Sequence, residues 1–442
     1  MRIEIWQDLT AEGRRAVLAR PALANDASLA GRVAAIIERV RSGGDAALLE
    51  LTAKLDRVEL ASFEVGQAEF AAAGGRLSDA QRAAIRAAAA NIEAFHKPQL
   101  PVPLAVDTAP GVRCERVSRP IESVGLYVPA GNAPLPSTAL MLGVPARLAG
   151  CPTRILCSPA QADGRADPAV LYAAQVSGVQ RVFKLGGAQA IAALAYGTET
   201  VPKVDKVFGP GSVWVTEAKA QVDRDPYGAA RDYPAGPSEV LVIADATANP
   251  VFVAADLLSQ AEHGADSQVL LLTTSAELAS AVAAQVESQK ATLPRLGIVD
   301  GALRHSRAVV VADLAEAFEI SNRYAPEHLI LQIARPRDWL PRVSAAGSVF
   351  LGAWTPETVG DYCSGTNHVL PTYGFARRYS SLGVNDFLRS MTVQELTSDG
   401  LRNLGPIATT LAELEGLDAH ARAVTRRLDA LDASKTRAGE RR

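Results

Sequence analysis

From Val124 onward the sequence alternates between short apolar runs of strand length and apolar-periodic stretches of helix length. The runs VGLYV (124–128), RILC (154–157), RVFKL (181–185) and KVDKVF (203–208) are separated by stretches such as STALMLGVPARLAG and AQAIAALAYG. Strand–helix units of about 30 residues predict a parallel sheet with right-handed crossovers. This pattern places the segment in the α/β class.

The same alternation starts again after the proline-rich segment 234–237. Further strands are predicted at EVLVIAD (239–245), QVLLLT (268–273), AVVVAD (308–313), LILQI (329–333) and SVFLG (348–352). We therefore predict an α/β protein with two Rossmann-like parallel-sheet domains, plus helical N-terminal and C-terminal segments.

The flanking regions carry apolar residues at helical spacing, both over residues 27–98 and beyond about Val384, where the strands are predicted to stop. The last residues are charged and lack an apolar anchor. The predicted organisation is an N-terminal helical segment (1–22), a first α/β domain (23–123 together with 238–383), a second α/β domain (124–237), a C-terminal helical arm (384–433) and a disordered tail (434–442).

Composition excludes several classes of protein. With 45 basic and 48 acidic residues the net charge is −3, which argues against a nucleic-acid or membrane-surface partner bound mainly by charge. The longest uncharged stretch, residues 123–146, contains four prolines (Pro129, Pro134, Pro136 and Pro145) and is not expected to span a membrane. The N-terminus does not resemble a secretion signal, and no C-x-x-C pair is present, so a cytoplasmic protein is expected.

Three predicted strands of the 124–237 domain end in glycine-containing turns, at residues 127–132, 185–189 and 208–212. Ligands of open α/β sheets bind beyond the carboxyl ends of the strands, and helix N-termini attract phosphate. Each glycine alone is explained by a tight turn, but the three turns together favour a nucleotide site. The G-x-G-x-x-G fingerprint is absent.

Two segments carry side chains suited to binding a metal or a substrate. Gln260 and His263 are three residues apart and share a helix face, which indicates either a metal site or an ordinary polar contact. The loop from Asp361 to His368 gathers an acid, hydroxyls, an amide and a histidine. Such loops are typical of binding sites, although turn chemistry also explains its acid and glycine.

Glu415 and His420 are five residues apart and converge only if the helix breaks between them. Gly416 is suited to end one helix and Asp418 to cap the next, which would place His420 in the first turn of the second helix. The alternative is a plain helical turn with a capping aspartate.

Glu327 and His328 follow Pro326, which disfavours helix at the residue before it. A carboxylate next to an imidazole supplies a base and a second group that handles protons. In a regular strand the two side chains would face opposite ways, so they share a site only in a loop or at a strand end. They lie at the amino edge of the predicted strand 329–333, which is not the usual ligand edge.

As a set, eight motifs resemble the histidinol dehydrogenase family from near residue 1 to about residue 433: YVPAG, LGGAQAIAALAYGTE, KVFGPG, PAGPSEVLVIAD, DLLSQAEHG, APEHL, GDYCSGTNHVLPT and MTVQEL. The resemblance implies oxidation of L-histidinol, through L-histidinal, to L-histidine, with two NAD reduced in turn. These are the last two steps of histidine biosynthesis. It also implies a zinc-dependent homodimer whose active sites are shared between chains.

Residue roles follow from the same motifs. The resemblance implies one Zn²⁺ per subunit, held by Gln260, His263, Asp361 and His420, and acid/base chemistry by Glu327 and His328. It implies that L-histidinol is bound by His328 and the four metal ligands together with Ser238, His368 and Glu415. NAD contacts map to Tyr127, Gln189 and Ser212; the family commonly has Asn at the last position, so one contact to NAD is in question.

Three other functions compete with this one. A related zinc- and NAD-dependent dehydrogenase of another amino-alcohol or diol would keep the metal and Glu-His motifs, but retention of Glu415 and His368 favours histidinol. A zinc hydrolase would leave the three glycine turns unexplained. A non-catalytic nucleotide-binding protein would leave the Glu327–His328 pair and the metal set idle. The resemblance also implies that no cysteine takes part in catalysis.

Overall fold

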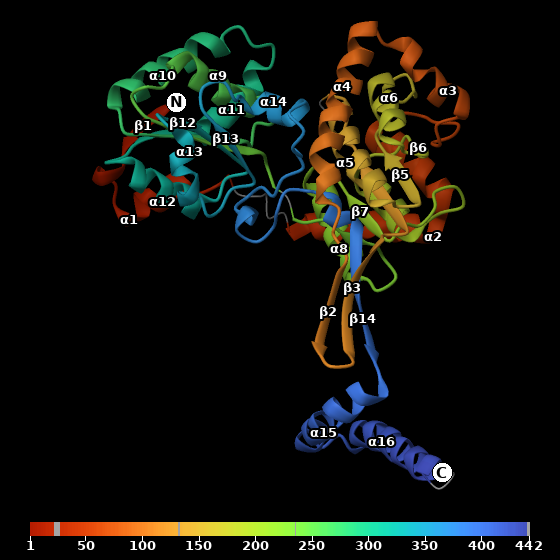
Figure 1. Ribbon diagram of the computed structural model, residues 1–442. Helices are drawn as coiled ribbons and strands as arrows, with labels where there is room; N and C mark the ends of the chain where they lie inside the picture. The colour runs from red at the N-terminus through yellow and green to blue at the C-terminus, as the bar shows by residue number, and fades with distance from the viewer. Residues whose placement is uncertain (22–26, 131–132, 235, 440–442) are drawn as a thin grey trace. The chain divides into compact units, whose positions relative to one another are not determined.

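A computed structural model describes residues 1–21, 27–130, 133–234 and 236–439. The chain forms two compact units. The first consists of Met1–Leu100 and Ile121–Phe387, and the second of Pro101–Pro120 and Leu388–Arg442. Figure 1 shows the helices and strands of both units. The first unit holds both parallel sheets.

One sheet is built from residues 123–231, with the strand order β6-β5-β4-β7-β8 and parallel pairing throughout. Its strands are β4 (Ser123–Tyr127), β5 (Thr153–Cys157), β6 (Arg181–Phe183), β7 (Lys206–Phe208) and β8 (Ala230–Arg231). Its helices are α5 (Pro136–Ala149), α6 (Pro168–Ser177), α7 (Gly187–Tyr196) and α8 (Val213–Arg224). The order reverses between β4 and β7, as in Rossmann folds, so the predicted class is confirmed here.

The other parallel sheet has the order β1-β11-β10-β9-β12-β13. Its strands are β1 (Arg2–Ile5), β9 (Glu239–Ala244), β10 (Gln268–Thr273), β11 (Arg307–Val310), β12 (His328–Gln332) and β13 (Ser348–Leu351). Its helices are α1 (Ala11–Leu18), α9 (Pro250–Ala261), α10 (Ala276–Lys290), α11 (Leu296–Arg304), α12 (Leu314–Tyr324), α13 (Pro336–Trp339) and α14 (Glu357–Tyr362). The order again reverses between the first strand of the repeat, β9, and β12.

Helices cover both faces of the sheet with the order β1-β11-β10-β9-β12-β13 (Figure 1). Along β9, Val240 and Val242 pack with α9, α10 and α11, whereas Leu241 and Ile243 pack with α12 and with Trp6 near the N-terminus. Successive strand residues face opposite sides, so a strand covered on both sides is apolar at every position. The uninterrupted run EVLVIA follows from this burial.

The N-terminal region differs from the prediction in two ways. Residues 1–22 were expected to be helical, but they begin with β1, which pairs in parallel with β11 at the sheet edge. Residues 23–123 were expected to join residues 238–383. Instead α2 (Ala27–Leu51) packs on α7 and α8, α3 (Gln67–Ala72) on α6, and α4 (Asp79–His96) on α5. Helical spacing predicts an apolar face but does not identify its partner, which explains the error.

The second unit is an antiparallel sheet followed by two helices. The sheet has the order β14-β3-β2, formed by β2 (Leu104–Ala109), β3 (Val112–Pro120) and β14 (Leu388–Leu396), and the helices are α15 (Ser398–Leu414) and α16 (Asp418–Gly439). The prediction of an all-helical arm over 384–433 is therefore wrong. The strand β14 depends on a partner about 270 residues earlier, and local patterns report such pairings poorly. Helix also replaces most of the predicted disordered tail, since α16 runs to Gly439; residues 440–442 lie outside the described part.

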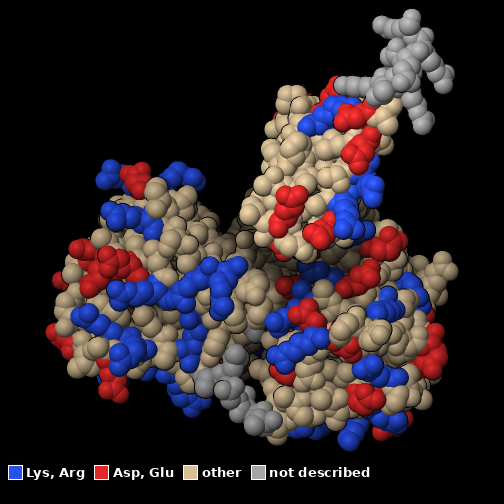
Figure 2. All heavy atoms as spheres, turned by 90° about the horizontal axis from the view of Figure 1, so that it is seen from below, with Lys and Arg blue, Asp and Glu red and all other residues tan. Residues whose placement is uncertain are grey.

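The surface carries both signs of charge. Lys and Arg are spread among Asp and Glu over the face seen in Figure 2, beside areas that carry neither. This mixture agrees with the small net charge of −3. Among the described residues, no helix is long and apolar enough to cross a membrane.

Candidate active site

The polar residues of the 238–383 segment gather at the amino edge of its sheet. Ser238 directly precedes β9, and His328 begins β12, in register with Val240 of β9 and Ser348 of β13. Helix α9 runs back along the sheet after β9, so its last turn, with Gln260, returns to the same edge. Glu327 and His328 therefore lie at the amino edge of this sheet, as the sequence predicted, and not at the carboxyl edge where ligands usually bind.

Glu327 and His328 are both buried and come together at the strand start. Ala325 has a left-handed backbone (φ 53°), and β12 begins only at His328, so Glu327 is not held to the alternation of a strand. A Glu327 carboxylate oxygen lies 3.7 Å from Nδ1 of His328 and accepts a hydrogen bond from the backbone N–H of Glu239 at 2.8 Å. The two side chains thus share one site.

Both ring nitrogens of His328 face acceptors. Nδ1 lies 3.3 Å from the carbonyl oxygen of Glu239, and Nε2 lies 3.3 Å from a carboxylate oxygen of Asp361. Burial lowers the pKa of His328, but the carboxylates of Glu357, Glu327 and Asp361 outweigh it and raise that pKa well above its usual range. The imidazole is therefore held as an imidazolium by the surrounding acids.

The three acids respond to burial in different ways. Burial raises the pKa of Glu327 to about 8, against the opposing effects of His328 and of the Glu239 N–H. Burial also raises the pKa of Glu357 well above its usual range. Asp361 is half-buried, and its hydrogen bond to His328 and the nearby histidines outweigh the effect of burial and lower its pKa. Glu327 and Glu357 thus favour their neutral forms, and Asp361 is the acid whose negative charge faces the imidazole.

Glu357 was not among the predicted site residues. It lies one helical turn before Asp361 on α14, so the two share a face, and together with His328 they form a group whose possible metal-ligand atoms lie within 4.8 Å of one another. One oxygen of its buried carboxylate has no hydrogen-bond partner. The spacing of four residues was a sequence signal for it, but the Glu lies just before the loop that attracted attention.

His368 is joined to Asp361 and to the 123–231 sheet domain. Its Nδ1 donates to the backbone carbonyl of Asp361 at 2.9 Å, and its Nε2 lies 3.2 Å from the hydroxyl oxygen of Thr138 on α5. Burial lowers its pKa, so this ring is neutral. The Asp361–His368 loop therefore brings both of its predicted residues to the site.

Gln260 and His263 fit a metal on separate observations. The side-chain amide of Gln260 is fully buried, yet neither its oxygen nor its nitrogen has a partner. His263 is exposed and uses Nδ1 to donate to the carbonyl of Ser259 at 3.0 Å, which leaves Nε2 free as a ligand. A buried amide oxygen without a hydrogen-bond partner and an imidazole nitrogen that makes no hydrogen bond are both suitable ligands for a cation.

Glu415 and His420 lie in the second unit and are both exposed. The predicted break between them is present, because α15 ends at Leu414, Gly416 has φ 70°, and α16 begins at Asp418. His420 consequently stands in the first turn of α16. Within one chain these two residues belong to a different unit from the rest of the predicted site.

The three predicted NAD residues lie at the carboxyl edge of the 123–231 sheet. The hydroxyl of Tyr127, at the end of β4, accepts from the Gly187 N–H at 3.1 Å, and buried Gln189 donates to Asp56 at 3.2 Å. Ser212 is exposed at the N-cap of α8, where its hydroxyl caps no backbone N–H. Tyr127 and Gln189 shape the turns, and Ser212 is open to a ligand. Residues 131–132 of the first turn lie outside the described part.

The whole chain is similar to one family of known proteins. The family profile described as Histidinol dehydrogenase matches residues 19–428. Proteins named histidinol dehydrogenase are 55% identical over 435 residues in Vibrio parahaemolyticus (98% of this chain, 100% of the relative) and 59% identical over 423 residues in Xanthomonas campestris pv. campestris (96% and 98%). The crystal structure of histidinol dehydrogenase from Elizabethkingia anophelis, 46% identical, superimposes with a TM-score of 0.93 over 98% of this chain and 99% of that one. The chain belongs to the histidinol dehydrogenase family.

Proposed function

We propose that this protein oxidises L-histidinol, through L-histidinal, to L-histidine, with two NAD reduced in turn. The proposal is supported by family membership over nearly the full chain. The observation that carries its chemistry is the buried Glu327–His328 pair, with Asp361 against the far nitrogen of the imidazole. These groups handle the protons that each oxidation releases.

In the alcohol oxidation, the substrate hydroxyl loses its proton to Nε2 of His328 while NAD, when bound, accepts the hydride. The carboxylates of Glu357, Glu327 and Asp361 around His328 favour the protonated ring and so stabilise the proton that it takes. In the aldehyde oxidation, Glu327 removes a proton from the water that adds to the carbonyl carbon. As the water adds, the carbonyl oxygen receives the first proton back from His328, which forms the hydrate. His328 is then free to take a hydroxyl proton of the hydrate as the second hydride passes to NAD.

Water is the better nucleophile here because the buried thiols are poorly activated. Burial raises the pKa of Cys151 to about 11 and that of Cys157 further still. A thiol so far from its ionised form is a weak nucleophile at neutral pH. Cys363 is exposed, but the neighbouring carboxylate and imidazole of Glu327 and His328 are suited to activate a water molecule instead. All four cysteines are unpaired, which supports a reducing, cytoplasmic location.

Zinc fits the residues present. Gln260, His263 and Asp361 would hold it from the first unit and His420 from the second, all with nitrogen or oxygen ligands that zinc accepts. Bound there, zinc would supply a positive charge that orients the polar groups of the substrate. The unpartnered Gln260 amide oxygen supports this assignment, as does the group of possible ligand atoms of His328, Glu357 and Asp361 within 4.8 Å of one another. Ser238, His368 and Glu415 would complete the substrate pocket.

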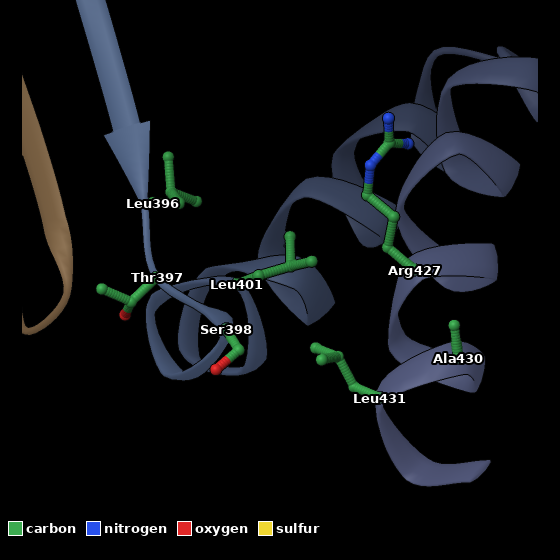
Figure 3. Close-up of a pocket in the computed structure, with 7 residues that line it drawn as sticks. All are labelled: Leu396, Thr397, Ser398, Leu401, Arg427, Ala430 and Leu431. Carbon is green, nitrogen blue, oxygen red and sulfur yellow. The ribbon is translucent and has the colours of Figure 1, made fainter. Parts of the chain in front are cut away.

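We propose that the second unit packs on another copy of this chain and that each active site is shared by two chains. The exposed apolar side chains of this unit include Ile407, Leu411 and Leu414 of α15, and Leu417 just after that helix. Figure 3 shows the leucines of β14, α15 and α16 that line a pocket of this unit. The volume of this pocket is about 650 Å³. Exposed large apolar side chains that gather on one element are typical of a protein–protein contact.

The stoichiometry of NADH against substrate tests the proposed function. Zinc-loaded enzyme with limiting L-histidinol and excess NAD should form two NADH for each L-histidinol consumed, and L-histidine should accumulate. One NADH would indicate an ordinary alcohol dehydrogenase, and none would exclude the proposed reaction. The same assay with another amino-alcohol or a diol shows whether the substrate class is histidinol.

A further inference from the structure

A buried ion pair holds the third glycine turn of the 123–231 sheet. Lys219 on α8 and Asp232, just after β8, lie 2.5 Å apart with side chains only 3% and 2% exposed. Lys219 also donates to the carbonyl oxygen of Gly209 at 2.8 Å, and the N–H of Gly209 donates to Asp232 at 2.9 Å. The two charges thus engage both polar groups of one glycine.

That glycine is where the chain leaves β7 for the turn that leads to Ser212. Gly209 has φ 123°, and an added Cβ would lie 2.1 Å from the backbone oxygen of Tyr127. Glycine permits this conformation without a steric clash but does not favour it over others. The conformation therefore needs an external restraint, which the Lys219–Asp232 pair provides.

Stability alone is a weak reason for such a pair. Removing two charges from water is costly, and apolar residues of similar volume commonly replace a buried ion pair with little loss of stability. What apolar residues would not replace are the two hydrogen bonds to Gly209. The specific contribution of the pair is therefore the geometry of the 209–212 turn.

We infer that Lys219 and Asp232 are positioning residues for the dinucleotide, acting through Gly209 on the turn that carries Ser212 and opens α8. The inference rests on the proposed NAD site. A preset turn spares the cofactor the cost of ordering the backbone on binding. Loss of the restraint should consequently weaken NAD binding without changing how histidinol binds or how protons move.

The test uses paired replacements, because a single replacement leaves one charge buried and unpaired. Lys219→Met with Asp232→Leu removes both bonds to Gly209, whereas Lys219→Met with Asp232→Asn restores one acceptor for the Gly209 N–H. For full-length zinc-loaded enzyme we expect KM for NAD to rise about tenfold or more in the Met/Leu variant and less in the Met/Asn variant. KM for histidinol and kcat should stay within about twofold of wild type. The dissociation constant of NAD, measured without histidinol, should follow KM for NAD.

Val222→Ala is the matched control, since Val222 is buried on the same helix and has no side-chain group that could replace the hydrogen bonds of Lys219 and Asp232 to Gly209. It should lower the melting temperature without changing KM for NAD. Unchanged NAD affinity in the Met/Leu variant would overturn the inference, as would a parallel rise in both KM values that follows the melting temperature. Failure of the wild-type enzyme to bind NAD or to form NADH would instead reject the proposed function.

Discussion

The environment of Glu327 predicts how the rate of aldehyde oxidation depends on pH. Burial raises its pKa to about 8, and a general base acts only in its deprotonated form. Oxidation of the aldehyde should therefore speed up as pH rises through about 8 and then level off. Glu327→Gln should slow this half-reaction about 10²–10⁴-fold and abolish its rise with pH.

Oxidation of the alcohol needs no added water, so Glu327→Gln should affect it less. Steady-state rates with L-histidinol and with L-histidinal separate the two half-reactions. Each rate is measured from about pH 6 to about pH 10, which is about two units on either side of the expected midpoint. His328→Asn serves as the comparison, since it should slow both. Equal losses in the two half-reactions after Glu327→Gln would contradict the division of roles.

Gln260 offers a test of the metal site that does not depend on turnover. Its amide is buried and unpartnered, so Gln260→Leu should leave the metal-free protein as stable as wild type or more stable. The same change should weaken zinc binding by more than about 100-fold, because a ligand is lost. Zinc content and the melting temperature with and without chelator are the measurements.

Gln332→Leu is the contrasting variant. Gln332 donates to buried Asp256 at 2.7 Å, so its loss should destabilise the protein and leave zinc binding unchanged. A Gln260→Leu protein that retains zinc with wild-type affinity would remove Gln260 from the metal set.

At the scale of residues, the sequence predicts local geometry well and long-range proximity poorly. The break at Gly416 and the placement of Glu327–His328 at a strand start both follow from neighbouring residues. Glu357 was missed because its role depends on α14 placing it near His328. Motif resemblance assigned Tyr127 to NAD, which stays a prediction; the bond that its hydroxyl accepts from the Gly187 N–H was not predicted.

At the scale of elements, the strand β13 is fitted tightly against the start of β12. An added Cβ on Gly347 would lie 2.6 Å from the backbone oxygen of Glu327. Gly347→Ala must therefore displace the backbone of Glu327, and a shift of about 1 Å is enough to lower kcat by about 10- to 100-fold. Steady-state kinetics measure the change in kcat, and a thermal melt measures the change in stability.

Gly297→Ala is the matched control for that substitution. Its added Cβ meets no atom within 4 Å, and the position lies in α11, where alanine is favoured over glycine. Activity should be unchanged and the melting temperature equal or higher. Wild-type kinetics in Gly347→Ala would show that the Glu327 backbone tolerates displacement.

The predictability of elements follows from where their partners lie. The two parallel sheets were predicted because each strand of a doubly covered sheet is apolar throughout and is followed by its own helix. The strand β14 was missed because its pairing with β3 joins residues near 115 with residues near 390. The strands β2 and β3 form a local hairpin, but they are largely exposed and lack the apolar runs by which the other strands were predicted. The helices at 27–96 were predicted but assigned to the wrong sheet, because helical spacing predicts an apolar face without identifying its partner.

At the scale of the whole molecule, the open question is which chain supplies Glu415 and His420 to a given site. Both belong to the second unit, whose apolar side chains Ile407, Leu411 and Leu414 are exposed. A closed two-fold dimer that buries these side chains would contain two identical sites. The alternative is a second unit that completes the site of its own chain.

Two inactive variants distinguish these arrangements. His420→Asn damages the second unit and His328→Asn damages the first, and each alone should be inactive. If the two are unfolded, mixed equally and refolded, about half of the dimers should be mixed when assembly is random. In a mixed dimer with shared sites, one site combines two intact units and the other combines both defects. Activity should therefore return to about one quarter of wild type. If each site is built from one chain, every site keeps a defect and no activity returns, provided that mass measurement shows the mixed dimer has formed.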